Sequence, residues 1–199
     1  MLEKGRFLEK FNKIFFLFFI FFITEKAFAD DLKSKIIDYN NNLKNSSALF
    51  IQTDGKTIEE GIVYIGLERI KVEYRSPQKI TIVLSKKRGM YVNHELQETQ
   101  YFNTKKSVVG IFFKILTGDD FFINSKITEF KDTITINKSF KINDTDYGVE
   151  IVYENEPIQL RKIKFKENDQ NFEIGLFNYS NFENTEKGFY SLINPYISN

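Results

Sequence analysis

The chain has 199 residues, with 28 Lys and Arg against 27 Asp and Glu, and it contains no cysteine. This balance argues against nucleic-acid binding, because nucleic-acid-binding proteins usually show a strong basic excess. The missing cysteine excludes disulfides and lipid attachment to a cysteine, so stability must come from a packed core, for which a chain of this length suffices.

The first 29 residues have the pattern of a secretory signal peptide. Basic residues precede the apolar run 14–23, and Ala27 and Ala29 form a cleavage site of small residues. We therefore expect cleavage after Ala29, export to the periplasm, and a single domain over residues 30–199. The alternative is an uncleaved anchor, although the apolar run is shorter than the ~20 residues that span a bilayer.

Residues 31–44 have the periodicity of an amphipathic helix. One stripe of this helix holds four apolar or aromatic side chains, namely Leu32, Ile36, Tyr39 and Leu43. After this segment the period changes from 3.6 residues to 2, which indicates β-strands.

Residues 106–117 form a second helical segment, and this one is apolar around most of its circumference. One side carries Val109, Phe112, Phe113 and Leu116, and an adjacent side carries Val108, Ile111 and Ile115. Such a helix is either buried on two sides or covers another apolar surface. It is therefore either an ordinary core helix or a lid over a hydrophobic cavity, and Gly110 within it can loosen it.

From Leu49 onward the chain reads as about eleven short strands with antiparallel connections, and Asp54-Gly55 is the clearest hairpin turn. Because large sheets twist, we predict a mainly β fold with an open, strongly curved sheet and the two helices on its concave face. One parity of neighbouring strands should line that face: Ile70, Val72, Tyr74, Ile80, Ile82 and Leu84. The side chains of the opposite parity, which include Lys71 and Glu73, should face water.

No catalytic or metal-binding pattern stands out. The single histidine, His94, has no second histidine or cysteine with which to build a zinc site or a catalytic triad. The sequence "DGKT" at residues 54–57 lacks the first glycine of a phosphate-binding loop. We therefore expect no enzymatic activity, no cofactor and no metal; an unrecognised hydrolase is the alternative.

The order of these elements resembles the periplasmic carriers of outer-membrane lipoproteins, the LolA-like family. The pattern of that family includes F-x-Q, a turn, a strand opened by glycine, and an arginine-led strand ending in Y-x-x-P. The matching residues, in order, are Phe50, Gln52, Gly61, Tyr64, Arg69, Tyr74 and Pro77. The resemblance covers nearly all of residues 30–199; no single motif is specific, but the ordered set is moderately so.

The resemblance implies a half β-barrel with lid helices over an acyl-chain cavity, in a monomeric periplasmic chaperone. Its partners would be acylated lipoproteins, the inner-membrane ABC transporter that releases them, and an outer-membrane receptor. The acyl chains would contact the six concave-face residues named above and five residues of the second helix: Val109, Ile111, Phe112, Phe113 and Leu116. Another lipid- or lipoprotein-binding protein of the same fold, either receptor-like or a glycolipid carrier, is the alternative.

One position departs from the family pattern. The family has Arg-Pro after its second strand, and this arginine is thought to latch the lid through hydrogen bonds. The chain has Leu67-Glu68 at this place. Arg69 is the candidate to supply the latch instead.

Overall fold

The computed structural model describes residues 31–117, 119–122, 124–142, 144–167, 170–183 and 188–197. The predicted signal peptide and its cleavage site lie outside these residues. Internal contacts divide the chain after Ile36, and the unit that begins at Ile37 contains all of the strands. No helix among the described residues is long and apolar enough to cross a membrane.

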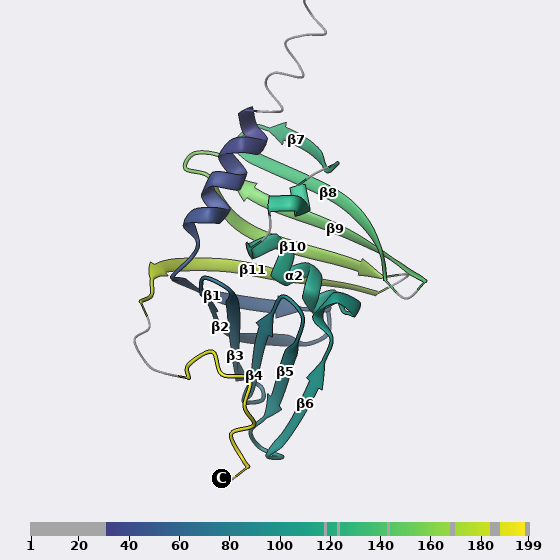
Figure 1. Ribbon diagram of the computed structural model, residues 1–199. Helices are drawn as coiled ribbons and strands as arrows, with labels where there is room; N and C mark the ends of the chain where they lie inside the picture. Colours follow the sequence, from purple (N-terminus) through teal and green to yellow (C-terminus); the bar gives the residue numbers. More distant parts are fainter. Residues whose placement is uncertain are drawn as a thin grey trace, which may run out of the picture. The chain divides into compact units, whose positions relative to one another are not determined.

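Eleven strands form one antiparallel sheet in the order β6-β5-β4-β3-β2-β1-β11-β10-β9-β8-β7 (Figure 1). The strands are β1 (Ser46–Thr53), β2 (Ile58–Ile65), β3 (Arg69–Ser76), β4 (Ile80–Ser85), β5 (Gly89–Asn93), β6 (Glu98–Phe102), β7 (Lys126–Phe130), β8 (Thr133–Ile142), β9 (Thr145–Glu154), β10 (Gln159–Glu167) and β11 (Gln170–Asn181). Two meanders, β1 to β6 and β7 to β11, are therefore joined side by side through the β1–β11 pair. The sheet is open, because β6 and β7 at its two ends do not pair with each other.

Helical segments occupy the two places predicted from the sequence. Residues 31–42 are α-helical. The connection between the two meanders contains the 3₁₀ turn η1 (Thr104–Lys106), the helix α2 (Val108–Thr117) and the 3₁₀ turn η2 (Asp119–Phe122).

The sheet curves around α2. Figure 1 shows that the strand direction changes markedly from β3–β6 to β8–β11. Val72 of β3 and Ile82 of β4 therefore face the same space as Phe165 of β10 and Ile174 of β11, with α2 between them. This is the open, strongly curved antiparallel sheet that the sequence predicted, with α2 on its concave face.

The opposite face of the first meander is covered by residues 188–197, which we call the C-terminal strap. Tyr190 and Leu192 of the strap pack on a cluster formed by Val83, Met90 and Val92. The strap therefore buries apolar side chains that belong to the outward parity of β4 and β5.

The strap also changes the surroundings of Lys71, which the alternation pattern assigned to water. Its Nζ lies 3.9 Å from the centroid of the Phe189 ring and 2.7 Å from the Glu73 carboxylate. The Lys71 side chain is only 15% exposed as a result. The prediction that this face is open to water was wrong at Lys71, because strand alternation does not reveal which faces a distant segment of the chain covers.

Gly110 permits a close approach of α2 to the turn before it. A Cβ atom at this position would lie 1.7 Å from the backbone oxygen of Thr104. The sequence suggested that Gly110 loosens the helix, whereas the structure gives it a packing role.

We predict that Gly110→Ala lowers the free energy of unfolding by ~1–3 kcal/mol, since α2 and η1 must separate to admit the methyl group. Urea unfolding measures this change. Gly148→Ala is the matched control, because its Cβ would have Lys166 Cβ at 3.7 Å as its nearest neighbour. Equal stability of the Gly110→Ala variant and the wild type would contradict the packing role of Gly110. Alanine has a higher helix propensity than glycine, so a loss of stability could not be explained by helix propensity.

Candidate functional site

An apolar cavity of about 200 Å³ lies between α2 and the concave face of the sheet. Its walls come from both meanders and from the first half of α2. The lining residues are Phe50, Gln52, Val63, Val72, Tyr74, Ile82, Val108, Val109, Phe112, Phe165, Phe172, Ile174 and Leu176. None of these lining residues is charged.

The cavity brings together several of the residues predicted to contact acyl chains. Val72, Tyr74 and Ile82 from the sheet face Val109 and Phe112 from α2 across it. These five residues come from three elements that are adjacent in space.

The remaining predicted residues lie outside the lining. The strand register places Ile70 opposite Leu84 and Tyr74 opposite Ile80, so all six strand residues share one face. Ile70 and Leu84 are fully buried and Ile80 is half-buried. Ile111, Phe113 and Leu116 of α2 are buried as well. That any of these residues contacts an acyl chain stays a prediction.

Part of the lining was missed because it comes from the second meander. Phe165, Phe172, Ile174 and Leu176 reach the cavity since β11 pairs with β1. The alternation in "RKIKFK" and "NFEIGLF" identifies the apolar face of β10 and β11. It does not reveal that this face continues the face of β1.

The two halves of α2 have different surroundings. Val108, Val109 and Phe112, in the first half, line the cavity, whereas Ile115 and Leu116 in the second half have no exposed surface. The helix is therefore a cavity cover at its beginning and a core helix at its end. The core-helix alternative therefore describes the second half, and the role of the first half as a lid stays a prediction.

Buried polar side chains hold both ends of the α2 segment. Asn40 is 5% exposed, and its Nδ2 donates to the backbone oxygen of Ile115 at 3.0 Å. The same Asn40 side chain lies 3.2 Å from the hydroxyl of Tyr153 on β9. Before the helix, the buried Thr104 hydroxyl donates to the backbone oxygen of Ser85 at 3.0 Å. These contacts fix the ends of the segment against the sheet and leave its middle to packing.

Arg69, the candidate latch, makes a different contact. Its Nη1 donates to the backbone oxygen of Tyr190 at 2.6 Å, which ties β3 to the C-terminal strap. Within the described part of the chain, this hydrogen bond reaches the strap and not α2. The structure therefore gives no contact in favour of a latch role for Arg69.

Three polar side chains meet at the end of the cavity nearest the β1–β2 turn. The Tyr74 hydroxyl donates to Gln52 Oε1 at 3.1 Å, and Gln52 Nε2 donates to Glu59 Oε2 at 2.8 Å. Burial, and then the charges of Glu59 and Tyr91, raise the pKa of Tyr74 above its ordinary value, so its hydroxyl stays a proton donor at neutral pH. We call these three residues the polar end of the cavity.

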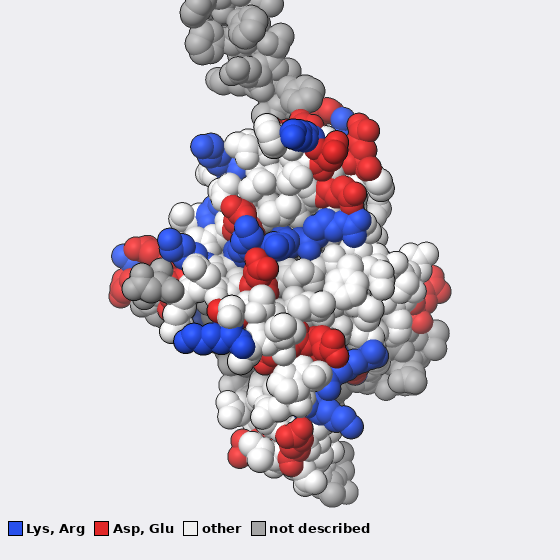
Figure 2. All heavy atoms as spheres, turned by 180° about the vertical axis from the view of Figure 1, so that it is seen from behind, with Lys and Arg blue, Asp and Glu red and all other residues white. Residues whose placement is uncertain are grey.

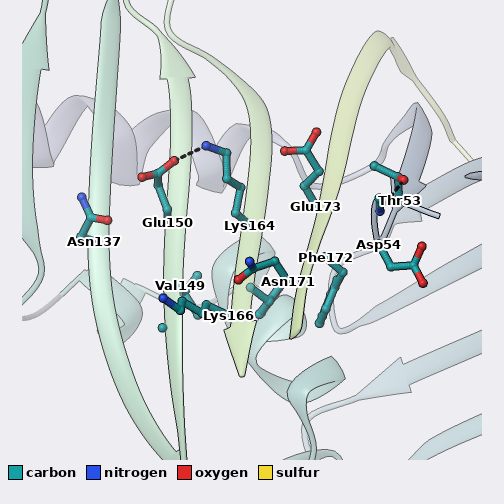
Figure 3. Close-up of a pocket in the computed structure, with 13 residues that line it drawn as sticks. Thr53, Asp54, Asn137, Val149, Glu150, Lys164, Lys166, Asn171, Phe172 and Glu173 are labelled. Atoms are coloured by element: carbon teal, nitrogen blue, oxygen red, sulfur yellow. Dashed lines mark hydrogen bonds and ion pairs between the residues drawn. The ribbon is translucent and has the colours of Figure 1, made fainter. Parts of the chain in front are cut away.

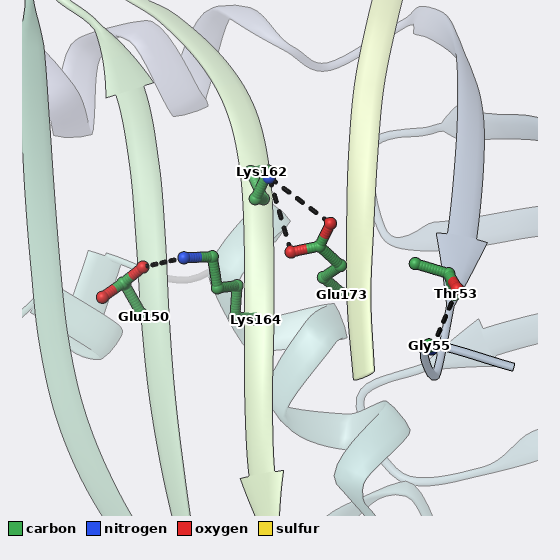
Figure 4. A network of polar contacts seen from close by, with 6 residues as sticks. All are labelled: Thr53, Gly55, Glu150, Lys162, Lys164 and Glu173. Carbon is green, nitrogen blue, oxygen red and sulfur yellow. Dashed lines mark hydrogen bonds and ion pairs between the residues drawn. The ribbon is translucent and has the colours of Figure 1, made fainter. Parts of the chain in front are cut away.

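A larger, open groove of about 730 Å³ runs over β8 to β11 beside the β1–β2 turn (Figure 3). Lys164 Nζ lies 2.6 Å from Glu150, and Lys162 Nζ lies 3.4 Å from Glu173 (Figure 4). These charges are therefore already paired across strands. Viewed from behind, Figure 2 shows a row of basic side chains across the middle of the face, with acidic side chains directly beside it.

The apolar cavity is the better candidate site of the two. Ligand sites are typically concave and mostly apolar, with a few converging polar groups, and the cavity between the sheet and α2 has this character. Among the described residues, no group of three or more His, Asp or Glu side chains is placed to hold a metal ion.

Comparisons with known proteins bear on the fold. No family model matches the chain, and no curated protein matches it in sequence. An uncharacterized conserved protein from Thermus thermophilus has a similar structure, with a TM-score of 0.50 at 8% identity over 79% of this chain and 89% of that one. This similarity shows the fold and says nothing of the activity.

Two further solved structures are more distant. LprF from Mycobacterium bovis has a TM-score of 0.35 at 13% identity, over 79% of this chain and 97% of LprF. PNGF-II has a TM-score of 0.37 at 6% identity, over 71% of this chain and 28% of PNGF-II. Neither similarity carries an argument about function.

Two adjacent phenylalanines of α2 allow a matched test of its two surroundings. Phe112 is 7% exposed and lines the cavity, whereas Phe113 is 8% exposed and does not. We predict that Phe113→Ala lowers the free energy of unfolding by ~3–5 kcal/mol. Phe112→Ala should cost less, because its ring already borders empty space. Urea unfolding of both variants checks this, and an equal or larger loss for Phe112→Ala would count against the division of the helix.

Proposed function

We propose that the protein binds acyl chains in the cavity between α2 and the sheet, and that it serves as a soluble periplasmic carrier of lipoproteins. The observation that supports this proposal is a cavity without charged lining residues on the concave face of an open sheet. The protein would take acylated lipoproteins from an inner-membrane ABC transporter and pass them to the outer membrane, where a receptor would accept them.

The physical reason is that acyl chains need an apolar cover in water. Burial of each CH₂ group is worth ~0.8 kcal/mol, so even part of a chain supplies a useful affinity. The cavity offers Phe50, Val63, Val72 and Leu176 as walls for such a chain.

The size of the cavity implies that α2 moves when a chain binds. An apolar cavity of ~150 Å³ holds benzene, so about 200 Å³ admits only a short stretch of hydrocarbon. Known ligand pockets span ~300–1,000 Å³. The first half of α2 is the part that would lift, with release of the Thr104–Ser85 hydrogen bond before it, because Val108 and Val109 are only half-buried while Ile115 and Leu116 have no exposed surface.

Binding and release are the whole of this proposed role. The sequence contains no nucleotide-binding motif, and the proposal includes no chemical step. The direction of transport would come from the transporter that releases the cargo and from tighter binding at the acceptor.

Mass spectrometry of the protein isolated from a bacterial periplasm tests the proposal. We expect acylated lipoproteins to co-purify with it. A free lipid or glycolipid in their place would favour a different lipid-binding protein of the same fold. A protein that co-purifies with no acylated molecule and binds no acyl probe would overturn the proposal.

Filling the cavity should block the function without unfolding the protein. We predict that Val109→Phe reduces capture of an acylated lipoprotein from inner-membrane vesicles at least about tenfold, since the added ring occupies the space of the chain. Leu67→Phe is the matched control. Leu67 is 67% exposed and lies outside the cavity lining, so this substitution adds the same ring away from the cavity. Thermal unfolding confirms that both variants fold, and unchanged capture by folded Val109→Phe would exclude the cavity as the binding site.

A further inference from the structure

Glu59 is an acidic residue on the apolar face of β2. The residues of its parity, Gly61, Val63 and Ile65, are all buried on the concave face, and Glu59 is half-buried beside them. Its neighbour across the strands is Gln52, which in turn lies opposite Ile174 of β11. In the described part of the chain, no ion pair involves Glu59.

The hydrogen bonds fix the orientation of the Gln52 amide. A carboxylate can only accept, so Gln52 must turn its NH₂ group toward Glu59 and its oxygen toward the Tyr74 hydroxyl. One N–H of Gln52 and one lone pair of its oxygen remain for a further partner. Gln52 and Tyr74 line the cavity, and Glu59 lies beside Gln52 across the β1–β2 pair, hydrogen-bonded to it.

We infer that the polar end of the cavity selects the polar group of the acyl ligand, accepting a neutral ester or amide and rejecting a carboxylate or phosphate. The inference rests on the proposed function, that the cavity binds an acyl chain, and deepens it by naming the class of ligand.

The selection follows from charge and desolvation. A neutral carbonyl at this place accepts the spare N–H of Gln52 and has no net charge to be repelled. An anionic group would lie near the Glu59 carboxylate in a half-buried place where no lining residue supplies a positive charge, and like charges repel more strongly as the dielectric constant falls. It would also lose its hydration shell without gaining a counterion.

Two probes of equal chain length test the selection with the full mature chain. Dodecanoic acid carries a carboxylate at pH 8, and its N-methyl amide is neutral. Calorimetric titration should give a dissociation constant for the amide at least about tenfold lower than that for the acid, because like charges near a protein surface repel each other.

The variant Glu59→Gln keeps the shape of the side chain and removes its charge. We expect the preference for the amide to fall to within about threefold, mainly through tighter binding of the acid. Glu60→Gln is the matched control, because Glu60 is the next residue, is exposed, and points to the other face of the sheet. The Glu60→Gln variant should prefer the amide to the same degree as the wild type.

The outcomes separate this inference from the proposed function. If the wild type binds neither probe, the proposed acyl-chain site fails. If it binds both equally, or if Glu59→Gln keeps the full preference, acyl binding stands and the selection by the polar end is overturned. A preference lost in Glu59→Gln and kept in Glu60→Gln supports the selection.

Discussion

A curved sheet with one apolar face must cover that face, because exposed apolar surface costs ~25 cal/mol per Å². Here the cover for the middle of the sheet is α2, which lies in the connection between the two meanders. Since the sheet bends around it, this helix of ten residues reaches side chains of β3 and β4 on one side and of β10 and β11 on the other. The position of every candidate binding residue depends on this arrangement.

The cover is incomplete, and the candidate site exists for that reason. Protein interiors are normally packed as densely as organic crystals, with few voids larger than a water molecule. The second half of α2 meets this standard, with Ile115 and Leu116 fully buried and Asn40 bonded to the helix backbone. The first half leaves apolar space under Val109 and Phe112. The α2 segment is therefore held at both ends, through Asn40 and Thr104, and covers unfilled apolar space between them.

The sequence predicted most of the fold but only part of the site, because periodicity reports faces and not neighbours. The alternation of Ile70, Val72 and Tyr74 identified an apolar face correctly, and the apolar run in α2 indicated a helix buried on several sides. Nothing in a strand pattern states that β1 pairs with β11, so the second wall of the cavity was missed. The partner of Arg69 was equally hidden, since the strap has no periodic pattern. Glu59 was hidden as well, because the strand carries a glutamate on each parity, Glu59 and Glu60, and the sequence does not tell which of them lies on the concave face.

The β1–β11 pair has a consequence for how the molecule is made. It brings Ser47 beside Ser180, which are 133 residues apart in the chain. Each meander grows through short hairpins, whereas this pair must close a very long loop, a slow and entropically costly event. The cavity takes walls from both meanders, so neither meander alone can form it. A growing chain therefore has no complete cavity until β11, which ends at Asn181, has been synthesised and has paired with β1.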